Sequence, residues 1–287
     1  MNIRIRPAVA ADIEVCSRII YEAFKGIADR HGFPSDFPTM EAANWLASSF
    51  ISHPSIFGAV AESDGRVVGS NFLDERDPIR AVGPITVDPR VQQRGIGRQL
   101  MQAVLERGQG SVGIRLLQDS FNCLSVSLYA SLGFDAKQPI LLMNGKPKSK
   151  LPAGFEVRPL AKQDLDSCAA LCAKTHGFDR ANELRDALQF FSPWVAVRGG
   201  RVTAYASTVT FWPLNHGVAE TDEDMKALLL GAGAATEEPL SFLLPVRHAS
   251  FFRWCLREGL RVVSPMTLMA MGEYQEPKGC YFVSVLY

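Results

Sequence analysis

The chain has 287 residues, of which 47% are hydrophobic and 21% charged, and its 30 lysines and arginines balance 30 aspartates and glutamates. This length suits two α/β domains of ordinary size better than one. Balanced charge provides no overall field for nucleic acid or an anionic membrane, so we expect neither as a partner. No stretch reaches the roughly 18 to 20 apolar residues of a membrane helix. The charged start MNIRIRPAVAADIEVC is unlike a secretory peptide, and we expect a cytoplasmic protein.

The first elements are a strand, a helix and a hairpin. NIRIRPAVAADIEVCSRII alternates like a strand up to Arg6-Pro7 and continues, after an acidic turn, as an amphipathic helix. SIFGAVAESDGRVVGSNFL is a strand, a Gly-containing turn and a second strand, which predicts a hairpin. The hairpin runs into DERDP, whose carboxylates are candidates for a cleft but equally suit a solvated turn.

AVGPITVDP (81–89) is the next predicted strand, and the turn QQRGIGR leads from it into a helix with Leu100, Met101, Val104 and Leu105 on its core face. A helix N-terminus offers unpaired N–H groups and the positive end of the helix dipole, and glycine lets a phosphate approach that backbone. The turn lacks the spacing of the two best-known nucleotide loops. Taken alone, it fits a phosphate cradle and a plain connection equally well.

A second helix follows the strand GIRLLQ, beginning at Asn122 and closed by Gly133. Asn122, Ser125 and Tyr129 fall on one stripe of this helix, and Leu124, Leu128 and Leu132 form the adjacent apolar stripe. NGKPKSKLPAG then has the composition of a linker, which places a domain boundary near Lys150.

Beyond the linker the same pattern recurs. GFEVRPLAKQDLDSCAALC repeats the strand, Arg-Pro and acidic turn of the N-terminus, and PWVAVRGGRVTAYASTV repeats the hairpin. We infer two copies of one mixed α/β unit, with chance recurrence of α/β patterns as the alternative. In the second copy Glu220, Asp222, Glu223 and Asp224 stand where the first has its glycine turn, and acids repel phosphates.

The six cysteines contain no CxxC pair, and we expect most of them to be reduced core residues. Cys168, Cys172 and His176 recur every four residues, but no second cluster is visible that would complete a zinc site. We therefore expect no metal.

The glycine turn and the Asn122 helix together resemble the GNAT (N-acetyltransferase) superfamily. Its acetyl-CoA loop reads Gln/Arg-x-x-Gly-x-Gly/Ala, which matches Gln92 to Gly97, and its next helix reads Asn-x-x-Ala/Ser-x-x-Leu-Tyr-x-x-x-Gly-Phe, which matches Asn122 to Phe134. The resemblance covers residues 3–144 well and the second half in outline. It implies an α/β (α+β) fold of two tandem GNAT-like domains, each a mixed, mostly antiparallel twisted sheet flanked by helices. Residues 1–146 would be the catalytic, acetyl-CoA-binding domain and 152–287 a degenerate domain without a CoA loop.

The resemblance also assigns roles to single residues. Ile85, Thr86 and Val87 would hold the pantetheine arm through their backbone, and Asn122 and Ser125 would contact the cofactor. Tyr129 would touch the cofactor and protonate the leaving CoA thiolate. The pyrophosphate would lie on the turn, formed by Gln92, Gln93, Arg94, Gly95, Ile96, Gly97 and Arg98.

The acceptor is expected to be the primary amine of a small molecule, which needs a base to take its proton. Glu75 and Asp119 are the candidate bases, and Asp74 is a candidate for contact with the substrate. The segment KGIADRHGFPSDFPT would line the acceptor site with Phe33 and Phe37. The second copy would serve packing, acceptor binding or homodimer formation. The alternatives are a non-catalytic acyl-CoA-binding sensor or interaction module, and an enzyme that acetylates protein amines.

Overall fold

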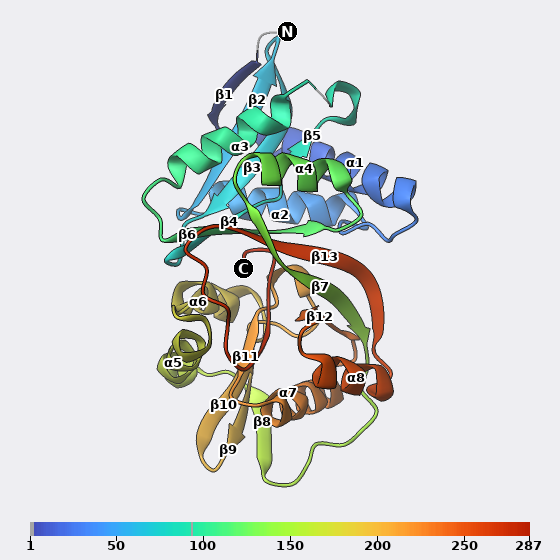
Figure 1. The fold of residues 1–287 in the computed structure, drawn as a ribbon, viewed down its shortest axis with the longest axis vertical. Helices are drawn as coiled ribbons and strands as arrows, with labels where there is room; N and C mark the ends of the chain where they lie inside the picture. Colours follow the sequence, from blue (N-terminus) through green and yellow to red (C-terminus); the bar gives the residue numbers. More distant parts are fainter. Residues whose placement is uncertain (1–2, 93) are drawn as a thin grey trace. The chain divides into compact units, whose positions relative to one another are not determined.

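The structure of the protein, a computed structural model, describes residues 3–92 and 94–287. Gln93, which the sequence places in the glycine turn, lies outside the described residues. Contacts divide the chain into two compact units, which are traced in Figure 1. The N-terminal unit comprises Met1–Leu116 and Phe121–Gly133, and the C-terminal unit comprises Leu117–Ser120 and Phe134–Tyr287.

The N-terminal unit is an antiparallel meander with helices packed against it. Its strands are β1 (Ile3–Pro7), β2 (Ile56–Ser63), β3 (Arg66–Asp74), β4 (Ile79–Val82), β5 (Thr86–Val87) and the start of β6 (Gly113–Asp119), and its helices are α1 (Ile13–His31), α2 (Met40–Ser52), α3 (Ile96–Arg107) and α4 (Cys123–Ser131). Strands β1 to β4 pair antiparallel in order, and β4 is parallel to β6. β3 is buried without alternation from Val68 onward, which shows that both of its faces are covered.

The C-terminal unit contains two groups of strands. Its elements are β7 (Asp135–Gly145), β8 (Phe155–Pro159), α5 (Leu165–His176), α6 (Ala181–Phe190), β9 (Trp194–Arg198), β10 (Arg201–Ala206), β11 (Gly217–Ala219), α7 (Asp222–Ala235), β12 (Leu240–Pro245), α8 (Ala249–Glu258), β13 (Arg261–Gly272) and β14 (Cys280–Phe282). One sheet has the order β14-β11-β10-β9-β8, and β7 pairs with β12 on one side and β13 on the other. The sequence assigns β7 to a domain of residues 1–146, whereas its contacts group it with the C-terminal unit. The boundary near Lys150 stays a prediction.

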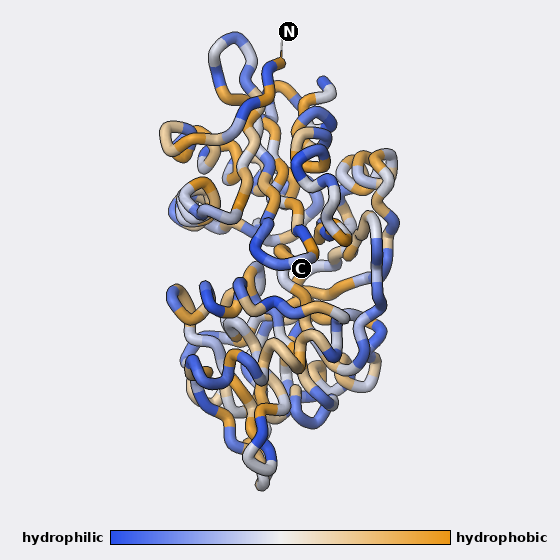
Figure 2. The backbone as a smooth tube through the Cα atoms, turned by 90° about the vertical axis from the view of Figure 1, so that its left-hand side faces the viewer, coloured by the Kyte–Doolittle hydropathy of each residue, from blue (hydrophilic) through white to orange (hydrophobic). Residues whose placement is uncertain are grey.

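The five-stranded sheet of the C-terminal unit separates two cores, one on each of its faces. Val195 and Tyr205 point into the core beneath α5 and α6. Their neighbours Ala196 and Ala204 point into the core formed with α7 and α8. Successive side chains of a strand face opposite ways, so β9, β10 and β11 each contribute to both cores. Figure 2 shows apolar stretches within both units and hydrophilic stretches in many outer loops.

Strands β1 and β8 lead into the same local structure. Arg6 donates two hydrogen bonds to Asp12, at 2.7 and 2.9 Å, and Asp12 also accepts from the backbone of Val9. Arg158 binds Asp164 with the same two distances, and Asp164 accepts from the corresponding backbone N–H. The Arg-Pro and acidic turn that recur in the sequence therefore fold into one repeated motif.

Three further observations concern the class of protein. Among the described residues, no helix combines the length and apolarity that a membrane crossing requires. Five of the six cysteines are buried, and Cys123 is exposed. The described part of the chain holds no group of three or more His, Cys, Asp or Glu side chains that could bind a metal ion.

Candidate active site

The strand predicted over residues 81–89 is interrupted by a bulge. β4 ends at Val82 opposite Leu73, and β5 begins at Thr86 opposite Ser70. Three residues therefore separate the two paired positions on this side, whereas two separate them on β3, which is the definition of a β-bulge. β4 is parallel to β6 up to the pair Ala81–Arg115, whereas β5 pairs with β3. In the described part of the chain no strand is paired with the other edge of β5. The bulge thus frees a backbone edge directly before the glycine turn.

The two glycines of the turn have different physical reasons to be glycine. Gly95 is the N-cap of α3 and has φ of 78°, a left-handed conformation that side chains disfavour. Gly97 lies inside the first helical turn and has no such constraint. A β-carbon there would meet Leu128, Val87 and Ile85 at 3.5, 3.9 and 4.0 Å, which are ordinary van der Waals contacts. Neither the backbone conformation nor the packing therefore explains why residue 97 is a glycine.

Gly97 faces an apolar strip that leads from the bulge to α4. The three side chains nearest to it come from the bulge (Ile85), from β5 (Val87) and from α4 (Leu128). The free N–H groups of the first turn of α3 attract anions at one end of this strip. A ligand with an anionic group and an apolar arm suits such an arrangement.

Two polar side chains of the turn form hydrogen bonds within the protein. Gln92 donates from its amide nitrogen to the Val87 carbonyl at 3.1 Å. Arg98 donates to the Ser131 hydroxyl at 2.6 Å, which ties the first turn of α3 to the last turn of α4. Arg94 is exposed. The backbone N–H groups therefore remain the main anion-binding feature, with exposed arginines beside them.

The residues of the predicted polar stripe of α4 differ in burial and in hydrogen bonding. The Asn122 side chain caps the helix by accepting from the Ser125 N–H at 3.4 Å. Tyr129 is the buried residue of the helix, at 6% exposure. Leu124, which the sequence places on an apolar stripe, is 60% exposed. The helix therefore packs through Tyr129 rather than through Leu124.

Aromatic contacts bring the segment between α1 and α2 to the start of α4. Phe33 stacks on Phe121 with ring centroids 4.3 Å apart and an interplanar angle of 8°. Phe37 packs edge-on against Phe24 at 4.9 Å. The predicted acceptor segment thus lies beside Asn122, the neighbour of Phe121. Sequence reasoning missed Phe121, although its position directly before the helix cap was a usable signal.

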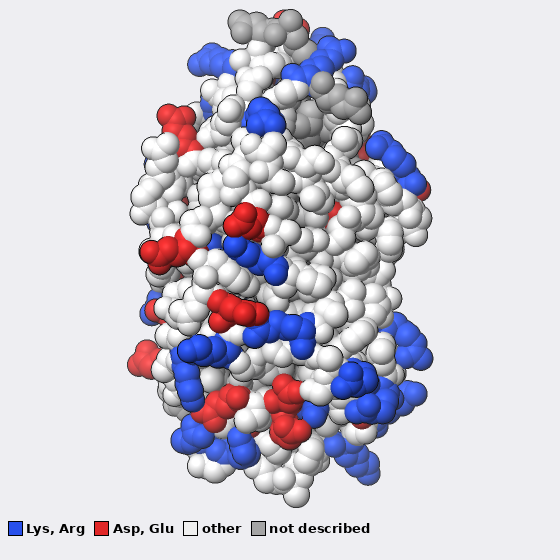
Figure 3. Space-filling view, in the orientation of Figure 1, with Lys and Arg blue, Asp and Glu red and all other residues white. Residues whose placement is uncertain are grey.

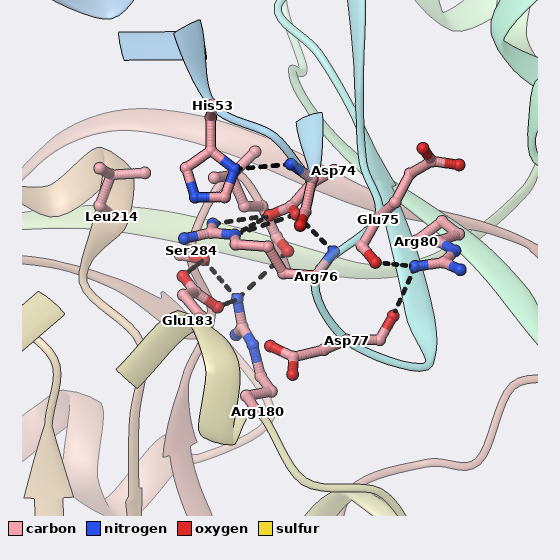
Figure 4. Close-up of polar contacts among 12 residues, drawn as sticks. His53, Asp74, Glu75, Arg76, Asp77, Arg80, Arg180, Glu183, Leu214 and Ser284 are labelled. Atoms are coloured by element: carbon pink, nitrogen blue, oxygen red, sulfur yellow. Dashed lines mark hydrogen bonds and ion pairs between the residues drawn. The ribbon is translucent and has the colours of Figure 1, made fainter. Parts of the chain in front are cut away.

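The candidate carboxylates have separate surroundings. Asp74 forms an ion pair with Arg76 at 2.6 Å, and both side chains are below 10% exposed (Figure 4). Glu75 pairs with Arg107 at 2.9 Å, at the end of α3 opposite the glycine turn. Twelve helical residues span about 18 Å, so Glu75 lies far from Gly97. Asp119 is buried at the end of β6 and groups with the C-terminal unit.

Comparison with known proteins places this site in a family. Residues 20–134 match the sequence model of the Acetyltransferase (GNAT) family, a range that contains the bulge, the glycine turn, α3 and α4. This segment is a GNAT acetyltransferase domain. Acetyl-CoA is the acyl donor that the family uses.

Individual proteins are similar to this chain in sequence or in fold. A curated relative, mycothiol acetyltransferase of Thermomonospora curvata, is 38% identical over 78 residues, which are 26% of this chain and 26% of that protein. A solved structure from Pyrococcus horikoshii covers 99% of this chain and 94% of its own, with a TM-score of 0.77 and 18% identity. A tandem GNAT protein from the clavulanic acid biosynthesis pathway covers 96% and 100%, with a TM-score of 0.58 and 15% identity. The expected fold class, mixed α/β with twisted, mostly antiparallel sheets flanked by helices, is confirmed.

The C-terminal GNAT-like domain has a different turn at the corresponding place. Asp222 to Asp224 form the first turn of α7, rather than preceding the helix as the sequence suggests. Asp224 is fully buried and accepts two hydrogen bonds of 2.9 Å from Arg198. These carboxylates already satisfy the positive end of the helix dipole and would repel a phosphate.

The residue at the position of Tyr129 also differs. Asn122 and His248 are the caps of α4 and α8, and the seventh residue after each cap is Tyr129 in the first helix and Cys255 in the second. The helix caps therefore align Cys255 with the tyrosine. Cys255 is buried, and burial raises the pKa of its thiol to about 12. A neutral thiol in the core is a poor proton donor.

Proposed function

We propose that the chain is an acetyl-CoA-dependent N-acetyltransferase whose N-terminal GNAT domain transfers an acetyl group to the primary amine of a small molecule. The family match over residues 20–134 supports acetyl transfer. The observation that carries the choice of site is Gly97, a helical glycine that neither backbone conformation nor packing requires and that faces an apolar strip. The whole protein's activity is a proposal, because the matched segment spans 26% of the curated relative.

In this proposal the backbone performs most of the binding. N–H groups of the glycine turn and of the first turn of α3, from Arg94 to Arg98, hold the pyrophosphate, and Gly97 leaves room for the phosphate to reach them. The free edge at Ile85, Thr86 and Val87 pairs with the amide groups of the pantetheine arm. Asn122 and Ser125, at the start of α4, contact the same arm. Direct transfer then needs no covalent enzyme intermediate, only a fixed geometry between amine and thioester.

Two proton transfers accompany the reaction. Tyr129 gives a proton to the departing thiolate, and its burial in α4 fixes the position of its ring. Asp119 is the proposed base that takes the proton of the amine, because Glu75 is engaged by Arg107 at the far end of α3. We leave Asp74 out of the acceptor site, since its carboxylate is paired with Arg76. Phe33, held on Phe121, and Phe37 provide apolar contact for the body of the acceptor.

The test is release of CoA thiol from acetyl-CoA by the full chain with a panel of small primary amines, compared with a lysine-containing peptide. The proposal expects release with at least one small amine and much slower release in Tyr129→Phe. Tight acetyl-CoA binding without release on any acceptor would favour an acyl-CoA sensor. Release with the peptide alone would favour a protein acetyltransferase. A cytoplasmic location and a homodimer stay predictions from the sequence.

A further inference from the structure

Six exposed cations gather in the C-terminal unit around the end of α8. We call them the basic surface: Lys146, Lys148, Lys150, Arg253, Arg257 and Arg261. The lysines follow β7, two arginines lie on α8 and the third begins β13. Figure 3 shows blue side chains gathered at its lower right, over α8 and the segment after β7, with few red ones among them.

The fold holds these segments together through one buried acid. The carboxylate of Glu258, the last residue of α8, accepts the N–H groups of Lys148 at 3.0 Å and Ser149 at 2.8 Å, and the Ser149 hydroxyl at 2.8 Å. Arg261 stands opposite Asn144 in the pairing of β13 with β7. A β-carbon on Gly259 would lie 2.9 Å from Cε of Lys148. The lysine segment therefore runs along the end of α8, beside Arg257 and Arg261.

The charge of this surface is neutralised only in part by Glu258, whose carboxylate attracts Lys148. Other arginines of the same unit, Arg158, Arg198 and Arg201, form ion pairs with carboxylates at 2.7 to 3.0 Å. Over residues 3–92 and 94–287, no ion pair includes any cation of the basic surface. Glu258 is 9% exposed and is occupied by the lysine segment. Because the whole chain is neutral, this local excess of like charge costs free energy that an anionic partner would offset.

Two exposed apolar side chains lie among the cations, and the side chains of this surface help to decide between a peptide, a nucleic acid and a membrane as the partner. Leu256 is 39% exposed beside Arg257, and Val262 is 42% exposed beside Arg261. Stacking of nucleic acid bases needs exposed aromatic rings, whereas Phe252 and Trp254 of α8 pack against the core. Two aliphatic side chains are also little apolar area for insertion into a bilayer.

The spacing of the lysines fits an extended peptide. Lys146, Lys148 and Lys150 occupy alternate positions of the segment after β7, and alternate side chains of an extended partner strand repeat about every 7 Å. We propose that the basic surface docks an extended acidic segment of a partner protein, in which carboxylates alternate with apolar residues. This inference is independent of the acetyl-transfer proposal, because none of these residues belongs to the GNAT active site.

The test measures binding of the full chain to a fluorescein-labelled peptide made of Glu-Leu-Glu-Ser repeats, by fluorescence anisotropy at low and high salt. The matched variants each reverse three exposed cations of the C-terminal unit. The first is Lys148→Glu/Arg253→Glu/Arg257→Glu, and its control is Lys162→Glu/Lys174→Glu/Arg185→Glu. Thermal unfolding checks that both are folded, and Lys148→Gln/Arg257→Gln replaces the first variant if it is not.

Three exposed ion pairs of ordinary strength correspond to about tenfold in affinity, so we expect at least that loss in the first variant and a change below about twofold in the control. Binding should also weaken as salt screens the charges. Equal loss in both variants, or none in either, would overturn the proposal. Tighter binding to a labelled oligothymidine or to phosphatidylglycerol vesicles than to the peptide would likewise overturn it, in favour of nucleic acid or membrane.

Discussion

Replacing Gly97 by alanine separates the stability of α3 from ligand binding at its N-terminus. Glycine inside a helix costs roughly 0.5 to 1 kcal/mol relative to alanine. The new methyl group would lie 3.5 Å or more from its neighbours, so it adds no clash. For a chain of this size the gain corresponds to a rise of about 1 to 4 °C in Tm. Gly95 is unsuitable for this test, because its φ of 78° makes any side chain costly.

The family loop accepts alanine at the position of Gly97, whereas the carboxylate of Gly97→Asp would stand where the proposal places the pyrophosphate. Loss of one hydrogen bond to a charged group costs about 1.5 to 3 kcal/mol, so acetyl-CoA affinity should fall at least about tenfold in Gly97→Asp and stay within about threefold in Gly97→Ala. Calorimetric titration with acetyl-CoA and a thermal melt measure the two effects. Gly26→Ala, in α1 with nothing within 4 Å of a β-carbon, is the matched control and should raise Tm without changing affinity. An unchanged affinity in Gly97→Asp, or a lowered Tm in Gly97→Ala, would refute the reasoning.

Other predictions address catalysis and stability. Tyr129→Phe should lower kcat by about a hundredfold or more in the thiol-release assay while acetyl-CoA affinity stays within about threefold. Glu75→Gln should leave kcat within about threefold, since this carboxylate has no part in the proposed proton transfers; a hundredfold loss would restore it as the base. Asp164→Asn should lower the free energy of unfolding by about 2 kcal/mol at pH 7. Because its arginine partner lowers the pKa of Asp164, this difference should persist above about pH 4 and vanish as the pH falls through the lower folded-state value, as urea titrations at several pH values would show. Residues 152–287 alone lack β7, which pairs on both edges, and should unfold without a cooperative transition in circular dichroism, whereas 134–287 should retain one; equal behaviour would contradict the central role of β7.

Local pattern was enough to predict the parts of the fold that depend on neighbours in sequence. The hairpin of β2 and β3, the helix after Gly95 and the Arg-Pro motif all depend on residues close together in the chain, and all form as expected. The bulge before Thr86 was not predicted, because AVGPITVDP reads as one strand until its pairing with β3 is known. The position of β7 between β12 and β13 depends on partners about a hundred residues away, which periodicity does not encode.

The same difference between local pattern and long-range contacts applies to the candidate site. The glycine turn and the Asn122 helix were found as motifs, whereas the use of each carboxylate depended on long-range partners. Glu75 lies 32 residues before the arginine that engages it. Leu124 is exposed although the sequence places it on an apolar stripe of the helix. Helical periodicity shows which residues share a face but not which face is covered. Only the structure distinguished the conformational need for Gly95 from the open space at Gly97.

Hydrogen–deuterium exchange of the full chain with and without acetyl-CoA tests the central claim most directly. The account predicts slower exchange in residues 85–101 and 122–131, where the backbone would hold the ligand, and no change in residues 217–235, where acids occupy the corresponding turn. Protection confined to 217–235, or none in 85–101 at saturating acetyl-CoA, would contradict the assignment of the site to the N-terminal GNAT domain.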